Sequence, residues 1–354
     1  DRTFRRVATL GLSLAAAGAV ALVSPTIAEG TVLGAGAPNA IPGSYLVVFK
    51  DGVHTTDITA KYGGQVKSVW KDALHGYSAT MSERQAKRLA ADPAVAYVEQ
   101  DQTFSLLTDQ VNPPSWGLDR VDQRTLPLNR VYTYTPTGAG VTVYIIDTGI
   151  RTTHTTFGGR AVWGTNTTGD GNNTDCNGHG THVAGTVGGS TYGVAKSSLL
   201  RAVRVLNCSG SGTNSGVIAG VDWVRANHIK PAVANMSLGG GASSAVDTAV
   251  NNAINAGVTF VVAAGNSNAN ACNYSPARTA SALTIGASTS TDARSSFSNY
   301  GSCVDLFAPG VSIRSTLPAS DTATGLKSGT SMATPHVAGV AAQFLQTAPV
   351  ATPK

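Results

Sequence analysis

Nearly continuous apolar runs recur along the last two thirds of the chain. They occupy residues 141–146, 199–206, 232–237 and 258–264. Strands that are buried on both faces of a parallel sheet have this pattern, whereas a strand with one solvated face alternates. Segments with helical character separate the runs, at 182–188, 214–227 and 245–256. The alternation predicts one α/β domain over about 109–354, with a parallel sheet covered by helices on both faces.

A smaller module precedes this domain and has a different rhythm. Its predicted elements are a strand at 45–49, a helix at 54–62, strands at 65–70 and 75–81, a helix at 82–91 and a strand at 94–99. Gly63 and Gly64 end the first helix, and Ser82 with Gln85 forms a capping box that begins the second. The order of elements predicts a small ferredoxin-like α+β domain over residues 44–108.

The beginning of the chain has the pattern of a targeting segment. Basic residues precede an apolar run from 7 to 23, and a small-residue cleavage site follows it. This predicts a signal peptide at 1–28 and a secreted, extracellular protein. A membrane span is the alternative, but the run is short for one and two glycines interrupt it. A linker rich in Gly, Ala and Pro is predicted at 29–43.

Charge and cysteine content narrow the classes of function. Charged residues make up only 13% of the chain, and the net charge of +5 includes no basic run, so we expect no nucleic-acid partner. The four cysteines are Cys176, Cys208, Cys272 and Cys303. In an exported protein they predict two disulfides with three possible pairings, of which neighbour pairing closes loops of similar length. No Cys-x-x-Cys spacing supports a metal site instead.

Polar residues follow two of the apolar runs, at the edge where parallel sheets carry their chemistry. Asp147 ends the first run, although a turn or helix cap also explains an aspartate there. Asn266 follows the fourth run and supplies an amide donor. His179 follows a glycine-rich turn just before a predicted helix, so its ring can project into the same cleft. His182 is expected to pack within the helix, and a zinc site on the two histidines lacks the Glu of a His-Glu-x-x-His motif.

Ser331 stands at the predicted start of an apolar helix. Its hydroxyl is then exposed and its backbone N–H free, because the first turn of a helix has no internal acceptors. A helix cap is the alternative role. Together Asp147, His179 and Ser331 are the parts of a charge-oriented nucleophile, and Asn266 is a candidate oxyanion donor.

The rest of the composition limits the competing chemistries. No glutamate follows Glu99. For the larger domain this excludes a serine protease that uses Glu, a zinc protease with a Glu general base and a glycosidase with two catalytic Glu residues. Lys327 could form a Ser–Lys pair with Ser331, but its polar loop favours a solvated lysine.

Three long motifs carry a family resemblance. Residues 146–149, 179–185 and 329–339 resemble the signature motifs of subtilisin-like serine proteases, the subtilases of peptidase family S8. Residues 116–119, 235–239 and 295–301 are similar to the proteinase K branch, and the cysteine spacing resembles that of aqualysin in particular. The resemblance covers about 109–349, and residues 44–108 resemble the inhibitory propeptide of these enzymes.

The resemblance implies a role for each candidate residue. Ser331 attacks the peptide carbonyl, His179 takes and later returns its proton, and Asp147 fixes the imidazole. Asn266 and the Ser331 N–H bind the developing oxyanion. The substrate lies extended along Ser237, Leu238 and Gly239, with Ala264 and Gly265 forming a wall of the pocket for the P1 residue, which precedes the scissile bond. Main-chain recognition implies broad specificity, and uncharged pocket segments imply apolar or aromatic P1 residues.

The resemblance also implies structural calcium and no organic cofactor. The backbone oxygens of Ala280 and Ala282 and the carboxylate of Asp305 match one site. A second site could use Asp119 and Asp122 together with Gln123 and Asn129, although a polar surface turn explains these residues equally well.

The expected life cycle is that of a zymogen. Residues 44–108 would act as an intramolecular chaperone and inhibitor, with a tail that lies in the cleft until it is cut between Leu107 and Gln110. The mature enzyme is expected to be a monomer that cleaves proteins and does not bind a membrane. Two alternatives are a catalytically silent subtilase-fold binding or adhesion module and a protease inhibitor, residues 44–108, with the rest of the chain as carrier.

Overall fold

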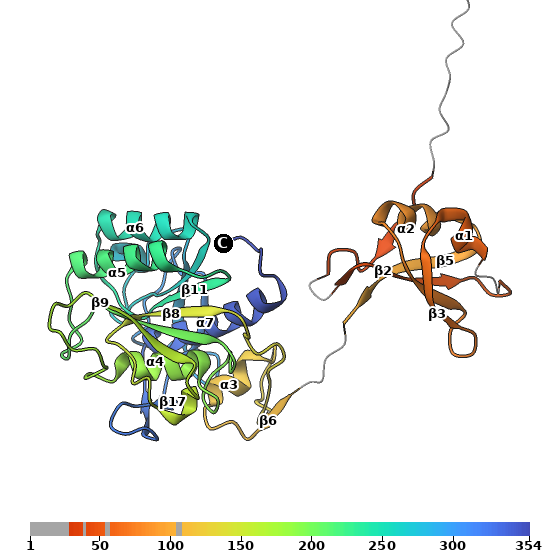
Figure 1. Cartoon of the computed structure of the whole chain (residues 1–354). Coiled ribbons are helices and arrows are strands. Elements are labelled where there is room, and N and C mark those ends of the chain that lie inside the picture. The colour runs from red at the N-terminus through yellow and green to blue at the C-terminus, as the bar shows by residue number, and fades with distance from the viewer. Residues whose placement is uncertain (1–27, 38–39, 54–56, 104–107) are drawn as a thin grey trace, which may run out of the picture. The chain divides into compact units, whose positions relative to one another are not determined.

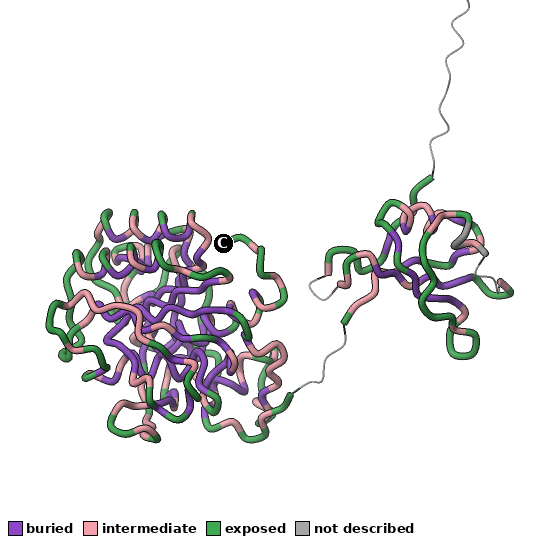
Figure 2. The backbone as a smooth tube through the Cα atoms, viewed as in Figure 1, coloured by how far each residue is buried: buried purple, intermediate pink, exposed green. Residues whose placement is uncertain are grey.

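The computed structural model describes residues 28–37, 40–53, 57–103 and 108–354, which belong to two compact units. The first unit ends at Thr103, and the second begins with Phe104 (Figure 1). Each unit has its own buried core (Figure 2). The signal peptide expected at 1–28, except for its last residue, lies outside the described residues, as does most of the expected inhibitory tail.

The first unit is an α+β sandwich with the predicted order of elements. Its elements are β1 (Val32–Leu33), β2 (Ala40–Phe49), α1 (Asp57–Tyr62), β3 (Gln65–Trp70), β4 (Gly76–Thr80), α2 (Glu83–Ala90) and β5 (Val95–Gln102). The sheet order is β1-β5-β2-β4-β3, and β2 runs antiparallel to both β4 and β5. Val47, Tyr77, Leu89 and Val98 fill its core because they share one side of the sheet with α2. The ferredoxin-like prediction and the Ser82 capping box are confirmed.

Part of the stretch expected to be a linker belongs to this sheet. Val32 and Leu33 pair in parallel with Val98 and Glu99 on β5, and β2 already begins at Ala40. The composition of this stretch does not indicate β1, because the strand has only two residues. Of these two residues, Val32 is buried. A strand this short forms only where a neighbouring strand already offers unpaired backbone groups.

The second unit contains a seven-stranded parallel sheet in the order β16-β15-β13-β11-β8-β10-β9. The strands are β8 (Thr142–Asp147), β9 (Ala161–Asn166), β10 (Leu199–Arg204), β11 (Ala232–Met236), β13 (Val258–Ala263), β15 (Leu283–Ser288) and β16 (Leu306–Pro309). The larger helices are α4 (His179–Gly188), α5 (Asn214–Asn227), α6 (Ser244–Asn255) and α7 (Thr330–Thr347). The smaller elements are α3 (Trp116–Val121), β6 (Asp109–Val111), β7 (Val131–Thr133), β12 (Gly240–Gly241), β14 (Tyr274–Ser275), β17 (Ile313–Thr316), β18 (Thr324–Lys327) and two short 3-10 helices, Thr155–Phe157 and Ala271–Asn273.

Helices cover both faces of this sheet, as the apolar runs predict. On β8, Val143 and Ile145 pack with α4 and α7, whereas Tyr144 and Ile146 pack with α5 and α6. Alternate side chains of a strand point to opposite faces, so a strand covered on both sides must be apolar throughout. Figure 1 shows α5 and α6 on one side of the sheet and α4 on the other.

Three strands of the seven-stranded sheet were not predicted from the sequence. β9 and β16 are the two edge strands, where residues such as Val162 and Phe307 stay exposed and the apolar run is broken. β15 contains Gly286, where a Cβ atom would come within 2.4 Å of the Phe307 ring. A small residue is therefore required inside a strand, and it hides the apolar pattern.

The predicted disulfides are confirmed, with neighbours paired. Cys176 is bonded to Cys208 and Cys272 to Cys303. None of the helices within the described residues is long and apolar enough to cross a membrane.

Candidate active site

Asp147 and His179 meet at the carboxyl edge of the sheet. Asp147 is the last residue of β8 and is fully buried. His179 is the first residue of α4, three residues before the predicted helix start, and its side chain is 24% exposed. Its Nδ1 lies 2.7 Å from Asp147 Oδ1, which also accepts the N–H of Thr148 at 2.7 Å. A carboxylate accepts only, so the proton is on Nδ1 and the Nε2 lone pair is available to act as a base.

The environment of His179 favours its protonated form. Burial of the ring by itself lowers the pKa of His179, but the charge and hydrogen bond of Asp147 outweigh burial and raise the pKa above its ordinary value. The Lys327 ammonium acts in the opposite direction, and Asp175 adds to the increase. A base with a raised pKa accepts a proton more readily, and it is neutral only at higher pH.

Ser331 is the second residue of α7, and it is not the helix cap. The cap position is Gly329, which offers no side chain. The Ser331 hydroxyl donates to the carbonyl oxygen of Ser237 at 3.1 Å, and the Ser237 hydroxyl donates to the Ser331 carbonyl at 2.9 Å. Within the described residues the Ser331 N–H has no acceptor, as expected for the first turn of a helix. The hydroxyl and a free N–H thus face the same cleft.

Thr330 orients the amide of Asn266. Its N–H and hydroxyl lie 2.8 and 3.0 Å from Asn266 Oδ1, and the hydroxyl also accepts the N–H of Gly265 at 3.1 Å. Because both bonds use the amide oxygen, the Nδ2 group remains to donate to a ligand. The sequence predicts a role for Asn266 but not for Thr330, since only the contact with Asn266 distinguishes this threonine.

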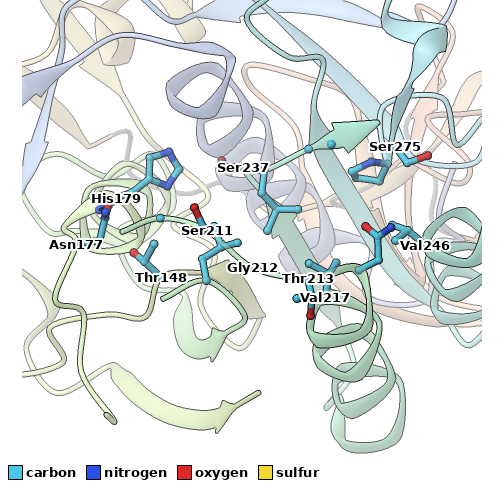
Figure 3. Close-up of a pocket in the computed structure, with 17 residues that line it drawn as sticks. Thr148, Asn177, His179, Ser211, Gly212, Thr213, Val217, Ser237, Val246 and Ser275 are labelled. Atoms are coloured by element: carbon cyan, nitrogen blue, oxygen red, sulfur yellow. Dashed lines mark hydrogen bonds between the residues drawn. The ribbon is translucent and has the colours of Figure 1, made fainter. Parts of the chain in front are cut away.

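Two pockets flank the segment 237–240. One, of about 250 Å³, is lined by Leu238, Gly239, Ala264, Gly265 and Ser331, and none of the described residues that line it is charged. The other, of about 420 Å³, extends from His179 past Ser237 to Val246 and Ser275 (Figure 3). The residues that the sequence predicts to bind substrate therefore lie together around Ser331.

One wall of the larger pocket was missed. Gly210, Ser211, Gly212 and Thr213 line it from the loop after β10, together with Ser237 and Leu238. Ser211 and Ser237 are both visible in Figure 3. This loop leaves the carboxyl end of β10 and is rich in Gly and Ser, which is the available sequence signal. The cleft thus offers backbone from two sides.

The alternative pairings are not formed. His182 is fully buried, and its Nε2 lies 3.0 Å from the Ile313 carbonyl oxygen and 3.3 Å from that of Gly325, so it packs within the fold as expected. Burial lowers the pKa of His182 to about 3, so the ring is neutral. The Ser331 hydroxyl bonds to Ser237, and not to Lys327.

Two of the three calcium ligands expected in the first set contact the same cation. The Lys354 ammonium donates to the Ala282 carbonyl oxygen at 3.2 Å and to the Asp305 carboxylate. Ala280 lies two residues before Ala282 in the loop that leads into β15. Oxygens that gather around one positive charge suit a hard cation.

In the second set of expected calcium ligands, both carboxylates accept hydrogen bonds from backbone N–H groups. The buried Asp119 carboxylate accepts the N–H groups of Asn129 and Arg130 at 3.2 and 2.9 Å, and Asp122 accepts that of Thr133 at 2.6 Å. Over the described ranges, no three His, Cys, Asp or Glu side chains form a group that could hold a metal ion.

Comparison with known proteins leads to the same class of enzyme. The Subtilase family matches residues 138–354, and Peptidase inhibitor I9 matches residues 44–107. The chain is 55% identical to the "Extracellular serine proteinase" of Thermus sp. (strain Rt41A), over 92% of this chain and 85% of that protein. It is 58% identical to "Alkaline serine exoprotease A" of Vibrio alginolyticus, over 80% of this chain and 54% of that protein. A solved structure, "Crystal structure of a cold adapted subtilisin-like serine proteinase", matches with 62% identity and a TM-score of 0.66, covering 67% of this chain and 87% of that one.

A buried Asp–His pair and a serine in the first turn of a helix, which both border the segment that contains Ser237, are typical of a serine hydrolase. Because the family match spans more than half of the residues, the chain belongs to the subtilase family. It is a secreted serine endopeptidase made as a zymogen with an I9-type propeptide. The alternative of a catalytically silent binding module finds no support in these comparisons.

Proposed function

We propose that Ser331 is the nucleophile of this endopeptidase, with His179 as general base and then general acid. Asp147 would hold the Nδ1 proton in place and stabilise the imidazolium that forms. The observation that carries the proposal is the 2.7 Å contact between His179 and Asp147 at the same edge as Ser331. Ser331 Oγ then forms an acyl–enzyme bond as the peptide C–N bond breaks, and His179 passes its proton to the leaving amine.

Substrate binding would also free the nucleophile. The Ser331 hydroxyl donates to the Ser237 carbonyl in the resting structure. An extended peptide that pairs with Ser237, Leu238 and Gly239 brings its own N–H to this carbonyl. The Ser331 hydroxyl would then turn to His179 Nε2, which supports deprotonation only when a substrate is present.

The oxyanion would be bound by two donors. The Asn266 Nδ2 group and the Ser331 N–H both lack an acceptor among the described residues. Donors that are fixed before the reaction stabilise developing charge without reorganisation, which is a large contribution to catalysis. We assign Asn266 and the Ser331 N–H this role.

Broad specificity with apolar or aromatic P1 residues follows from the cleft. The pocket beside Ala264 and Gly265 has about 250 Å³ and an uncharged lining. Backbone on both sides of the larger pocket recognises extended peptides of many sequences. The substrates are therefore proteins and peptides, and no nucleic acid is expected.

Calcium would replace the Lys354 ammonium among the oxygens of Ala280, Ala282 and Asp305. The convergence of two of these oxygens on Nζ supports a cation site. The ion would supply structural stability and no step of the reaction. For the second set, Asp119 and Asp122, calcium stays a prediction, because backbone donors already satisfy part of each carboxylate.

The proposed maturation uses the remaining segments. Residues 1–28 would direct export, 29–43 would precede the inhibitory core of the propeptide, 44–108 would assist folding and inhibit, and 109–354 would be the monomeric catalytic domain. The I9 match at 44–107 supports this division. Cleavage between Leu107 and Gln110 would separate propeptide and enzyme.

Intact mass after expression tests the proposal, with wild type compared to Ser331→Ala and to the matched control Ser328→Ala. Ser328 lies on the same segment, and its hydroxyl accepts the N–H of Ser312. We expect wild type and Ser328→Ala to lose the propeptide, to hydrolyse an apolar peptide ester and to react with a serine-directed covalent reagent.

Ser331→Ala should keep the propeptide, and it should neither hydrolyse the ester nor react with the serine-directed reagent. Equal hydrolysis or equal labelling of Ser331→Ala would overturn the assignment. Identical processing of all three proteins, with activity still lost in Ser331→Ala, would instead assign the cutting to another protease.

A further inference from the structure

Asp175 is a buried carboxylate that none of the proposed steps uses. It is 3% exposed and lies in the segment before α4, four residues ahead of His179. Burying a charged carboxylate is costly unless hydrogen bonds satisfy it. The groups that donate to Asp175 therefore indicate what its charge organises.

Five hydrogen bonds converge on this carboxylate. Oδ1 accepts from the Thr148 hydroxyl at 2.9 Å and from the N–H groups of Asn177 and Gly178 at 3.0 and 2.7 Å. Oδ2 accepts from the N–H and the hydroxyl of Thr181 at 2.8 and 2.6 Å. A carboxylate has about four lone-pair sites, so these donors saturate it.

The donors come from both segments that hold the Asp–His pair. Thr148 follows Asp147 at the end of β8, whereas the other donors flank His179. The Thr148 hydroxyl in turn accepts the N–H of Gly180 at 2.9 Å. A Cβ atom on Gly180 would come within 2.2 Å of the Gly149 carbonyl oxygen, so the two segments are in close contact.

The carboxylate also takes the place of a helix cap. The cap residue of α4 is Gly178, which has a positive φ of 94° and no side chain to satisfy the first N–H groups. Asp175 accepts those of Gly178 and Thr181. A negative charge at this end of a helix is stabilising, and it fixes the turn on which His179 lies.

We propose that Asp175 is a positioning residue that sets the contact between His179 and Asp147 by bonding the first turn of α4 to the end of β8. This rests on the function proposed for the Asp–His pair. Asp175 itself lines neither pocket and does not contact the reacting atoms, so it acts through His179. Burial has the largest effect on the pKa of His179 and lowers it, and Asp147 raises it. The charge of Asp175 makes a smaller contribution that also raises this pKa.

Kinetics of Asp175→Asn in the full-length protein test the proposal. The amide keeps the shape but removes the charge and turns an N–H group toward other donors. With a peptide p-nitroanilide carrying Phe at P1, we expect kcat to fall by up to about 100-fold, because small misplacements of catalytic groups have effects of this size. KM should change less than kcat, since Asp175 does not itself line the cleft. The acid limb of the kcat/KM profile should move to lower pH, because loss of a nearby negative charge lowers the pKa of His179.

Asp170→Asn is the matched control. Asp170 belongs to the same segment, accepts the N–H of Asn172 at 3.0 Å and pairs with the buried guanidinium of Arg204. It has no bond to the Asp–His pair, so this variant should lose stability and keep its pH profile. The proposal is overturned if Asp175→Asn keeps wild-type kcat, or if both variants show the same loss with an unshifted acid limb.

Two further measurements decide the remaining cases. If Asp175→Asn does not fold, Thr148→Val removes one donor and should lower kcat several-fold, whereas the acid limb should stay in place because the charge of Asp175 remains. An unchanged kcat would overturn the proposal. In the Ser331→Ala background, an NMR titration of His179 should give a lower pKa for Asp175→Asn, and an unchanged pKa would overturn it. Because the titration needs no hydrolysis, an inactive wild type would contradict the proposed function alone.

Discussion

At the scale of single residues, Thr330 decides which way the Asn266 amide faces. Its two bonds to Asn266 Oδ1 are 2.8 and 3.0 Å long, and the side chain of Thr330 is fully buried. Rotating the amide would sacrifice both bonds, so the Nδ2 donor is fixed before substrate arrives. Sequence motifs place a threonine before Ser331, but they do not say what it contacts.

Replacing Thr330 with Val should therefore lower kcat. The change keeps the shape and the N–H but removes the hydroxyl, and a typical hydrogen bond contributes about 1 kcal/mol, which corresponds to a fall of about fivefold. KM should stay unchanged, because the interaction acts on the transition state. Steady-state kinetics on a peptide p-nitroanilide measure the effect.

Thr334→Val is the control for this experiment. Thr334 is equally buried on the same helix, and its hydroxyl donates to the Thr330 carbonyl at 2.8 Å, away from Asn266. Its kcat should match wild type. If both variants lose the same fraction of kcat, orientation of Asn266 is not the cause.

At the scale of elements, two helices begin at the proposed catalytic residues. α4 begins at His179, three residues before the predicted start at 182. The sequence does not indicate this first turn, because Gly180 and Thr181 have low helix propensity. Tertiary contacts, above all the bonds to Asp175, hold this first turn. α7 begins at Thr330 and continues through Pro335 to Thr347, and on it His336 is fully buried.

His336 should make the fold sensitive to acid. Its Nδ1 donates to the Met332 carbonyl at 2.8 Å, Nε2 is buried without a partner among the described residues, and burial lowers the pKa of His336 to about 4. The unfolded chain binds this proton near pH 6.5, so stability is intact above that pH and falls as the pH drops toward 4. The two pKa values correspond to a loss of about 3 kcal/mol.

Urea unfolding in the Ser331→Ala background, at pH 7 and pH 4, measures this loss. His336→Gln should reduce the difference between the two pH values by about 3 kcal/mol. His228→Gln, at a partly exposed histidine whose Nδ1 contacts the Arg225 carbonyl oxygen, is the control and should leave the difference unchanged. An undiminished difference in His336→Gln would assign the acid sensitivity to other groups, such as His182.

At the scale of the whole molecule, two separate cores accompany two separate family matches. The I9 match ends at residue 107 and the Subtilase match begins at residue 138. The described units divide between Thr103 and Phe104, close to the predicted cut. A chain built from two independent cores can lose one by a single cleavage without disrupting the other.

Calcium should stabilise the larger unit through Asp305. We expect added calcium to raise the Tm of the Ser331→Ala protein, because a hundredfold excess over Kd adds about 3 kcal/mol to the free energy of unfolding. Asp305→Asn should weaken this response, and Lys354→Ala should strengthen it, because the ammonium no longer competes for the same oxygens.

Calcium titration calorimetry of the same variants gives the affinity directly. Asp321→Asn serves as the control, since Asp321 is partly exposed and pairs with Arg151 instead. A calcium response that is identical in all variants would place the ion elsewhere, and Asp119 with Asp122 would be the next positions to test.

The sequence by itself determined the fold class, the two modules and the kinds of side chain at the strand ends. Apolar runs predict buried parallel strands because such strands have no wet face. Motifs identified Asp147, His179, Asn266 and Ser331 as candidates, and the neighbour pairing of the cysteines was confirmed. What these signals share is that each lies within a short segment.

Only the tertiary structure decided the contacts between segments. His179 meets Asp147 across 32 residues, Thr330 meets Asn266 across 64, and Ser331 meets Ser237 across 94. These contacts depend on the order of the seven strands in the sheet and on the loops that join them. Three of the seven strands were not predicted from the sequence. Asp175 and Thr330 look ordinary in the sequence, because a buried polar residue acquires its role from the partners that the fold brings to it.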